Sequence, residues 1–280
     1  MVTHARVFSL QAKNFDLTNN IGLFISSAFS FIKKKFGFDN MCTWDKIRNI
    51  QIKLPIKSDG NVDFEFMESF IAELEAERVA ELSAYLKASG FDNYELSVEE
   101  KNALQEYERL EWDLFNLEAL FGKSTRGKRL KSADRISGKL PFVTAGEANE
   151  GISAYISNKV EVFEKNTTTI DMFGSAKYRN YKYGADDHIA VVHTENIPMK
   201  ASIFLTSSIH KAAHTGKFDY GHNFYAKDAD ELDIMLPVKN GQPDYDVMEL
   251  LISAVQKLVI KDVVKYSDAK ISATKQVVQE

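Results

Sequence analysis

The chain has 280 residues, of which 44% are hydrophobic and 27% charged, and its formal net charge at pH 7 is −5. These proportions are typical of a globular protein with a sizeable core and exclude an intrinsically disordered chain. The single cysteine, Cys42, excludes an internal disulfide and a cysteine-ligated zinc site. Because no apolar run is long enough to span a bilayer and no secretory signal is evident, we expect a cytoplasmic protein.

The N-terminal part of the chain predicts one short helix, over about residues 19–31. A strand is expected to end at Leu54-Pro55 and to enter a turn at Ser58-Asp59-Gly60, because these residue types are frequent where the chain reverses. This part therefore contributes only a few local elements before the first long helix.

A helix of about 25 residues is predicted to follow this turn. Asp63 is a suitable N-cap, and Gly90 is a suitable stop. Apolar residues recur every three to five positions, so we expect this helix to pair with a second long helix in an antiparallel, coiled-coil-like manner. The stripe consists of Phe66, Phe70, Leu74, Val79, Leu82 and Leu86.

From about Glu111 the pattern changes to short β-prone runs separated by turns. We expect a β-rich body with a short helix near residues 201–213. The expected strands cover residues 140–144, 154–156, 168–170 and 189–192, with glycines 138, 146, 151, 174 and 184 between them.

The end of the chain repeats the order seen near the beginning. A strand is expected to end at Leu236-Pro237, Asn240-Gly241 forms a turn, and a second long helix follows the cap Asp244. The apolar stripe of this helix includes Leu251, Val255 and Leu258, which are the expected partners of the first helix.

An internal repeat relates these two regions. Lys53-Leu54-Pro55-Ile56-Lys57 matches Met235-Leu236-Pro237-Val238-Lys239, and the matches continue upstream and downstream in the same order. The second copy is preceded by residues 111–187, which have no counterpart before the first copy. The expected fold class is therefore α+β, with a partial β-rich body, a long helix, a complete body and a second helix.

Charge is segregated along the chain. Residues 61–111 contain fourteen acids and four bases, whereas residues 122–139 contain seven bases and one acid, Asp134. A local surface of this sign attracts phosphates even when the total charge is negative. The acidic segment is compatible with a solvated helix face.

Three short motifs resemble known sites but lack essential members. In the P-loop-like segment 122–129, Arg129 replaces the hydroxyl residue that would hold magnesium. His210 and His214 have a metal-binding spacing but no evident third ligand, and Glu99-Glu100-Lys101 has no strand around it. The sequence also lacks the paired prolines of amino-methyltransferases. We therefore expect no cofactor, no metal site and no catalytic residue in this chain.

A series of short motifs runs in a fixed order through the β-rich segment. It comprises Glu111-Trp112-Asp113-Leu114-Phe115, Gly127-Lys128-Arg129-Leu130, Ala133-Asp134-Arg135, Leu140-Pro141-Phe142-Val143-Thr144-Ala145, Asn149-Glu150-Gly151-Ile152, Thr169-Ile170-Asp171-Met172-Phe173-Gly174, Tyr178 and Ala185-Asp186-Asp187-His188. This series resembles the target recognition domain of type I restriction–modification specificity subunits, and the resemblance covers nearly the whole chain. It departs from the family pattern at the front, where the first domain lacks its N-terminal portion.

The resemblance implies four segments. Residues 1–60 would be the C-terminal portion of a truncated first recognition domain, and residues 61–110 a long spacer helix. Residues 111–242 would be a complete second recognition domain, and residues 243–280 a second spacer helix.

The implied function is sequence-specific DNA recognition by a non-catalytic subunit. Its partners would be double-stranded DNA and methyltransferase (M) subunits, joined in the larger complex by restriction (R) subunits, with no membrane. The methyltransferase would carry S-adenosylmethionine. Two other functions stay open: a helical protein-interaction scaffold, and a truncated remnant that recognises no complete site.

Candidate DNA-contact residues fall into two groups, because Lys and Arg neutralise phosphates whereas Arg, Asn, Gln and Thr read base edges. The expected phosphate contacts are Lys123, Arg126, Lys128, Arg129, Lys131 and Arg135. The expected positioning or reading residues are Thr144, Asn149, Lys177, Tyr178, Arg179, Tyr181 and Lys182. The alternative is that both groups are ordinary surface bases and buried tyrosines.

Overall fold

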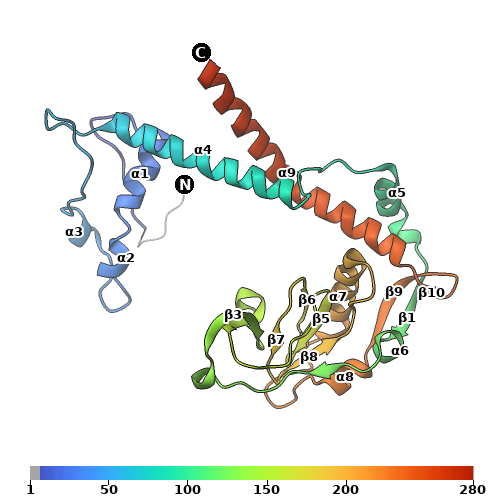
Figure 1. The fold of residues 1–280 in the computed structure, drawn as a ribbon. Coiled ribbons are helices and arrows are strands. Elements are labelled where there is room, and N and C mark those ends of the chain that lie inside the picture. The colour runs from blue at the N-terminus through green and yellow to red at the C-terminus, as the bar shows by residue number, and fades with distance from the viewer. Residues whose placement is uncertain (1–6, 280) are drawn as a thin grey trace. The chain divides into compact units, whose positions relative to one another are not determined.

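The computed structural model describes residues 7–279 and is α+β, as expected (Figure 1). Residues 1–6 and 280, at the outer limits of the expected segments, lie outside this description. The chain forms two compact units: unit 1 consists of Met1–Asn93 and Lys261–Glu280, and unit 2 of Tyr94–Ile260. Within the described residues, none of the helices has the combined length and apolarity needed to cross a membrane.

Unit 1 is helical. Its elements are α1 (Asn19–Ala28), α2 (Ile32–Lys35), α3 (Trp44–Ile47), α4 (Phe64–Ala88) and the C-terminal part of α9 (Tyr245–Gln279). Helix α1 packs on α4 through the ring of Phe24, whose centroid lies 6.3 Å from that of Phe66 and 5.8 Å from that of Phe70. Asn20 adds a hydrogen bond to Glu68 at 2.9 Å.

Helix α4 begins and ends where the sequence predicts. The Asp63 carboxylate accepts the Phe66 N–H at 2.9 Å, which satisfies a free donor of the first turn. At the other end Gly90 adopts φ +69°, and the Phe91 N–H reaches back to the Leu86 carbonyl at 2.8 Å. This pattern is a Schellman termination, which needs a left-handed residue at the glycine. The segment 61–110, expected as one spacer helix, contains two α-helices, α4 and α5 (Val98–Glu106), and the short 3-10 helix η1 (Tyr107–Arg109).

The apolar stripe of α4 does not face one single partner. Phe66 and Phe70 contact α1, whereas Val79 and Leu86 are buried, Leu82 is half-buried and Leu74 is 38% exposed. In unit 1 the C-terminal part of α9 meets α4 at Glu75, which accepts hydrogen bonds from Lys270 at 2.7 Å and Tyr266 at 3.2 Å. On the unit 2 part of α9, Leu251 is buried, but Val255 and Leu258 are exposed. The pairing of these residues with α4 stays a prediction.

Unit 2 contains three small sheets, whose strand orders are β1-β9-β10, β2-β8-β5-β6 and β4-β3-β7. The expected strands are present as β3, β4, β5 and β8. The strands are β1 (Trp112–Asn116), β2 (Thr125–Arg126), β3 (Ser137–Val143), β4 (Ile152–Ile156), β5 (Thr167–Asp171), β6 (Ala176–Arg179), β7 (Gly184–Ala185), β8 (Ile189–Val192), β9 (Asp233–Lys239) and β10 (Gln242–Pro243). The helices are α5, η1 (Tyr107–Arg109), α6 (Leu117–Phe121), η2 (Ser132–Asp134), η3 (Ala148–Gly151), α7 (Met199–Ala213), α8 (Ala226–Asp230) and the first part of α9.

Two glycines lie inside strands and not between them, contrary to expectation. A Cβ on Gly138 of β3 would come within 2.4 Å of the Ile156 backbone. A Cβ on Gly184 of β7 would come within 2.8 Å of the Val160 side chain. Close packing therefore explains these two positions better than turn geometry does.

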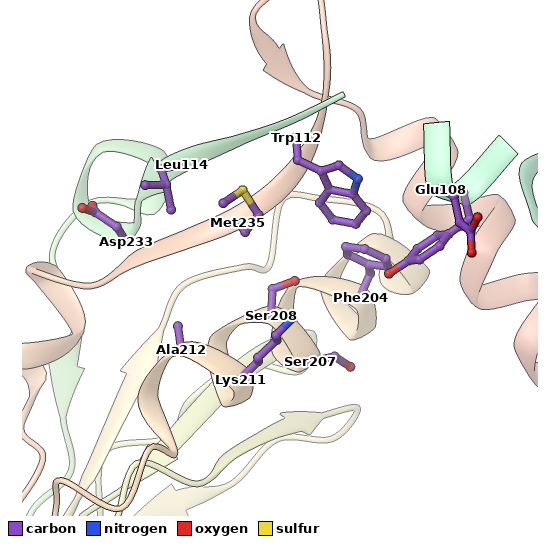
Figure 2. Close-up of a pocket in the computed structure, with 11 residues that line it drawn as sticks. Glu108, Trp112, Leu114, Phe204, Ser207, Ser208, Lys211, Ala212, Asp233 and Met235 are labelled. Atoms are coloured by element: carbon purple, nitrogen blue, oxygen red, sulfur yellow. The ribbon is translucent and has the colours of Figure 1, made fainter. Parts of the chain in front are cut away.

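Strands β1 and β9 pair antiparallel with Trp112 opposite Pro237, and their outer face forms a groove with α7 and η1 (Figure 2). Figure 2 shows Trp112, Leu114 and Met235 along the strands, with Phe204 of α7 beside them. The groove has a volume of about 630 Å³. None of the candidate DNA-contact residues lines it.

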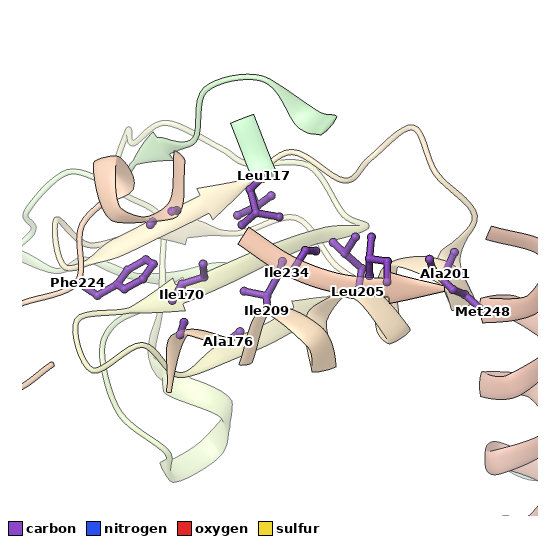
Figure 3. Packing of buried hydrophobic residues seen from close by; sticks show 14 residues of the cluster. Leu117, Ile170, Ala176, Ala201, Leu205, Ile209, Phe224, Ile234 and Met248 are labelled. Carbon is purple, nitrogen blue, oxygen red and sulfur yellow. The ribbon is translucent and has the colours of Figure 1, made fainter. Parts of the chain in front are cut away.

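The main core of unit 2 lies between α7 and the strands that it covers (Figure 3). One face of α7 is fully buried, because apolar side chains recur there at helical spacing. This face consists of Ala201, Leu205, Ile209 and Ala213, all 0% exposed. Met248, near the start of α9, belongs to the same cluster and is also fully buried. Helix α9 is therefore anchored in unit 2 at its N-terminal end.

The two copies of the repeat have the same local geometry. The Pro55 carbonyl accepts the Asp63 N–H at 2.9 Å, and the Pro237 carbonyl accepts the Asp244 N–H at 2.8 Å. Asp244 caps α9 through the Val247 N–H at 3.1 Å, as Asp63 caps α4. The β-bridge between Ile56 and Val62 corresponds to the pair of Val238 with Pro243. The repeat is thus a structural one.

Strand formation differs between the copies, and both strand predictions need correction. Pro237 does not end its strand, because β9 continues to Lys239 before the turn at Asn240-Gly241. Residues 54–55 form no strand and are followed only by the isolated bridge from Ile56. Strand β9 is held by its ladder with β1, and the described residues contain no equivalent of β1 before the first copy.

Candidate nucleic-acid interface

The basic segment, residues 123–135, passes through β2, an edge strand of the four-stranded sheet. Thr125 lies opposite Val191 of β8, and its hydroxyl is 2.9 Å from Nε2 of His193. The other ring nitrogen of His193 lies 2.9 Å from the Glu195 carboxylate. This hydrogen-bond chain fixes β2 on the sheet and thereby fixes the start of the basic segment.

Gly127 lets the basic segment run close against residues 185–186. A Cβ at this position would lie 2.3 Å from the carbonyl oxygens of Ala185 and Asp186. The Lys128 N–H donates to the Ala185 carbonyl at 2.9 Å, and the Leu130 N–H donates to the Asp186 carboxylate at 3.1 Å. The segment is therefore attached to residues 185–186 through its backbone N–H groups.

Asp187 brings two arginines together. Its carboxylate lies 3.6 Å from the guanidinium of Arg126 and 3.7 Å from that of Arg129. Arg126 also donates through Nε to the Asp187 carbonyl and lies over the ring of Tyr225, with 5.1 Å to the centroid. One carboxylate thus faces two guanidiniums whose side chains are 47% and 61% exposed, so positive charge remains on the surface.

Asp187 also belongs to a group with metal-binding geometry among the described residues. Ligand atoms of Asp186, Asp187 and His188 lie within 4.8 Å of one another. Both carboxylates already have protein contacts: Asp186 accepts the Leu130 N–H, and Asp187 forms ion pairs with the two arginines, although its buried Oδ1 has no hydrogen-bond partner within residues 7–279. We therefore interpret this group as the anchor of the basic segment.

The other bases of the segment differ in exposure. Lys123, Lys128 and Lys131 are exposed. Arg135 is half-buried: it donates to the Leu130 carbonyl at 3.3 Å and to the Ser153 hydroxyl at 3.2 Å, and its guanidinium lies over the ring of Phe142. Five of the six expected phosphate contacts thus lie on the surface, whereas Arg135 also joins the segment to β4.

The second candidate group is engaged within unit 2. Lys177 contacts Glu147 at 3.2 Å, the Tyr178 hydroxyl donates to the Asn166 side chain at 2.9 Å, and Lys182 contacts Glu164 at 2.7 Å. Burial raises the pKa of the Tyr178 hydroxyl. Arg179 is 1% exposed and contacts the hydroxyl of half-buried Tyr181 at 2.9 Å. A buried guanidinium cannot reach DNA in this conformation, which argues against the expected direct contact by Arg179.

Thr144 and Asn149 lie in the loop between β3 and β4. Thr144 is half-buried and donates its N–H to the Gly151 carbonyl at 2.8 Å, which closes the loop. Asn149 is exposed and adopts a left-handed backbone, with φ +53°. The loop thus carries exposed Asn149, and two other candidates contact it: Lys177 through Glu147 and buried Arg179 through the Glu150 carbonyl.

Two acidic residues were missed among the candidates. Asp187 orients the arginines, and Asp171, which is 3% exposed, accepts the Gly146 N–H of the loop at 3.3 Å. The available signal was their position within the quoted motifs, Asp171 three residues before a turn glycine and Asp187 beside His188. Acids do not stand out in such a pattern, because phosphate contacts are made by bases.

The motifs that lacked essential members have local roles. The ring of His210 stacks on that of His214, and its Nδ1 accepts the Ala176 N–H at 3.1 Å. Glu100 forms a capping box with Ser97 at the start of α5 and pairs with Lys257 at 2.9 Å. These contacts stabilise unit 2.

Comparisons with known proteins agree with the motif series. A family model described as type I restriction modification DNA specificity domain matches residues 1–84 and 109–266. The type II restriction enzyme BgcI specificity subunit S.BcgI of Heyndrickxia coagulans is 26% identical over 250 residues, which are 88% of this chain and 69% of that protein.

Two solved structures are similar at 15% identity. The S subunit of a type I restriction–modification system from M. genitalium gives a TM-score of 0.49 over 91% of this chain and 69% of its own. The HsdS subunit from Thermoanaerobacter tengcongensis gives a TM-score of 0.38 over 91% of this chain and 65% of its own. The chain thus spans about two thirds of the length of these proteins.

Proposed function

The chain belongs to the type I restriction modification DNA specificity domain family, and from this premise we propose that unit 2 reads DNA sequence for a restriction–modification complex. The role of the chain is sequence-specific DNA recognition together with other components of such a complex. In this proposal the chain is non-catalytic, and it directs methyltransferase and restriction subunits to the target site in the cytoplasm. The relative from H. coagulans is itself named a specificity subunit, which supports this division of labour.

The observation that carries the proposal is the exposed basic segment, which comprises β2 and the residues on either side of it. Five bases, Lys123, Arg126, Lys128, Arg129 and Lys131, are exposed on a segment whose backbone is fixed by β8 and residues 185–186. Each phosphate that such a base neutralises releases a counterion and adds affinity without sequence information. The local charge can therefore attract DNA although the whole chain is acidic.

The repeat supports a division into two lobes. We infer that residues 111–242 form a complete recognition domain and that residues 1–60 belong to a first one, with the segments 61–110 and 243–280 as spacers. The shared turn, bridge and cap geometry at Asp63 and Asp244 supports the equivalence of the two lobes. Unit 2 would then read one half of a bipartite target.

The proposal is tested by charge removal on the basic segment. The triple variant Arg126→Ala, Arg129→Ala, Lys131→Ala should weaken binding to every duplex and flatten the salt dependence of affinity, by about 0.9 in log–log slope for each phosphate that is no longer neutralised. Fluorescence anisotropy of the full chain with a random-sequence duplex, measured over a salt series, gives this slope. A matched control removes three bases elsewhere: Arg78→Ala, Lys101→Ala, Arg109→Ala.

An unchanged slope in the triple variant would remove the basic segment from the interface. If the unmodified chain fails to retain DNA even at low salt, the scaffold function becomes the better explanation. Co-purification with the methyltransferase of its own complex tests the partner. A chain that binds neither this methyltransferase nor DNA would be a non-recognising remnant.

A further inference from the structure

The loop between β3 and β4, residues 144–151, has an unusual backbone. Four of its residues are left-handed: Gly146 at φ +140°, Asn149 at +53°, Glu150 at +55° and Gly151 at +78°. Left-handed backbone is uncommon for residues other than glycine and costs conformational energy. Such a loop persists only when surrounding groups hold it, so its anchors are informative.

The principal anchor is the buried side chain of Arg179. Its Nε donates to the Thr169 hydroxyl at 2.9 Å, and its Nη1 donates to the Glu150 carbonyl at 2.8 Å and to the Tyr181 hydroxyl at 2.9 Å. All three acceptors are neutral oxygens. A buried guanidinium is costly without strong compensation. The bond to Glu150 therefore ties this costly group to a left-handed residue.

The neighbouring residues of β6 and β5 supply two more anchors. Lys177, two positions before Arg179 and on the same face of β6, contacts the Glu147 carboxylate at 3.2 Å. Asp171, at the end of β5, accepts the Gly146 N–H at 3.3 Å. The loop is thus fixed at its start, middle and end by one strand pair.

The composition of the loop limits what it can do on DNA. Residues 144–151 contain no lysine or arginine, and they include the acids Glu147 and Glu150. Such a loop adds no attraction to phosphates, but Asn can pair with adenine and Glu can accept from the amino group of cytosine in the major groove. Glu147 is held by Lys177, which leaves exposed Asn149 and Glu150 for this reading.

The loop also lies next to the basic segment. The Asp186 N–H donates to the carbonyl of Val143, the residue before the loop, at 2.9 Å. Arg135 contacts Ser153, two residues after the loop, at 3.2 Å. A duplex held by the exposed bases would therefore have this loop at its side.

We propose that Arg179 is a positioning residue, which holds the loop 144–151 so that Asn149 and Glu150 read base edges. This inference rests on the proposed function, in which the basic segment supplies phosphate contacts. Arg179 itself touches no DNA. Its replacement changes which sequences are preferred and leaves the number of phosphate contacts as it was.

The test compares sequence selection with the salt slope. The full chain is used to enrich a duplex library with a randomised core, and affinity is then measured for the enriched and a scrambled duplex. Arg179→Lys keeps the charge but removes the fork that bonds Glu150, so the affinity ratio should fall by about tenfold or more. The salt slope on the scrambled duplex should stay unchanged. Arg109→Lys, at an exposed arginine of η1, is the matched control.

Two further variants keep the inference falsifiable if Arg179→Lys unfolds. Gly151→Ala displaces the loop while residue 179 stays an arginine, because the new Cβ would lie 2.7 Å from the Thr144 carbonyl but 3.8 Å, an ordinary contact, from Arg179 Nη2. Asn149→Gly removes the reading side chain at a backbone that glycine tolerates. Both should lower the affinity ratio at an unchanged salt slope. A purely structural role would lower the melting temperature and leave the ratio of the folded variant as it was.

The outcomes separate this inference from the proposed function. If the unmodified chain enriches no sequence, the proposed function fails. If it enriches a sequence, and folded Arg179→Lys or, where that variant unfolds, Gly151→Ala and Asn149→Gly keep the full affinity ratio, the positioning role of Arg179 is overturned.

Discussion

The two copies of the repeat are alike at the start of their long helices and unlike in the burial of the short helices upstream. At the start of both long helices a proline carbonyl accepts the N–H of the capping aspartate, and Met67 and Met248 are both 0% exposed. The short helices upstream differ, although Leu23-Phe24-Ile25 of α1 matches Ile203-Phe204-Leu205 of α7 in the repeat. Leu205 is 0% exposed, whereas its counterpart Ile25 is half-buried. Turns and caps therefore follow from local sequence in both copies, whereas complete burial of the short helix accompanies the β-rich body of the second copy.

Truncating the buried face of the short helices should destabilise the two units by very different amounts. Leu205→Ala should lower the free energy of unfolding by about 2–5 kcal/mol, because it leaves a cavity in a closed core. Ile25→Ala should cost less than about 1.5 kcal/mol, since its site is partly open already. Urea unfolding measures the decrease in the free energy of unfolding, and hydrogen exchange assigns it to unit 1 or unit 2. Equal decreases would contradict the difference in burial.

A second difference concerns how the long helices are anchored. Glu100, which is 4% exposed, ties α5 to α9 through Lys257. Burial pushes the pKa of Glu100 upward, but hydrogen bonds from Lys257, Ser253 and the Ser97 backbone outweigh it and lower the pKa from 4.5 to about 2. In unit 1 the corresponding contact of α4, Glu75 with Lys270, is more exposed.

The lowered pKa predicts acid sensitivity of unit 2. A carboxyl whose pKa is lower in the folded state stabilises the fold above its ordinary pKa of 4.5, and this stability is lost as the pH falls toward 2. Glu100→Gln should remove about 2 kcal/mol at neutral pH and flatten the acid limb of the stability profile. Glu99→Gln, at the exposed neighbour, is the control. An unchanged acid limb in Glu100→Gln would show that the pair contributes little.

Removing the shared N-caps should lower the stability of both long helices by a smaller and similar amount. Asp63→Ala and Asp244→Ala each remove one N-cap hydrogen bond and should each cost about 1 kcal/mol. Because the cap geometry is shared, the two costs should agree within about 0.5 kcal/mol. Hydrogen exchange at the first turn of α4 and of α9 provides the measurement. Clearly unequal costs would show that the surroundings, and not the cap, determine the stability of these helix starts.

Much of the fold was predictable because its signals are local. The spacing of apolar residues predicts α4, with Asp63 as its N-cap and Gly90 as its stop, and the observed helix begins and ends accordingly. The strands β3, β4, β5 and β8 follow from β-prone runs between turns. The basic segment was also visible in the sequence, because its bases lie close together along the chain and charged side chains are mostly exposed to solvent.

The rest depends on partners that are distant in sequence. The strand expected at Leu54-Pro55 is missing because strand pairing needs a second strand, which no local pattern supplies. Arginine is a residue type that often contacts DNA, yet the guanidinium of Arg179 donates to the Thr169 hydroxyl, the Tyr181 hydroxyl and the Glu150 carbonyl. A basic residue in a strand does not reveal which face of the sheet it occupies until the sheet is known.

Gly127 carries no charge, yet its lack of a side chain determines where the charged residues around it can lie. Any larger residue there would collide with the carbonyls of Ala185 and Asp186, so the main chain leading to Asp187 would have to shift. Asp187 would carry with it the two guanidiniums of Arg126 and Arg129. Mutational tolerance at residue 127 is thus coupled to that of three charged neighbours, and homologues with another residue there would need compensating changes along 185–187.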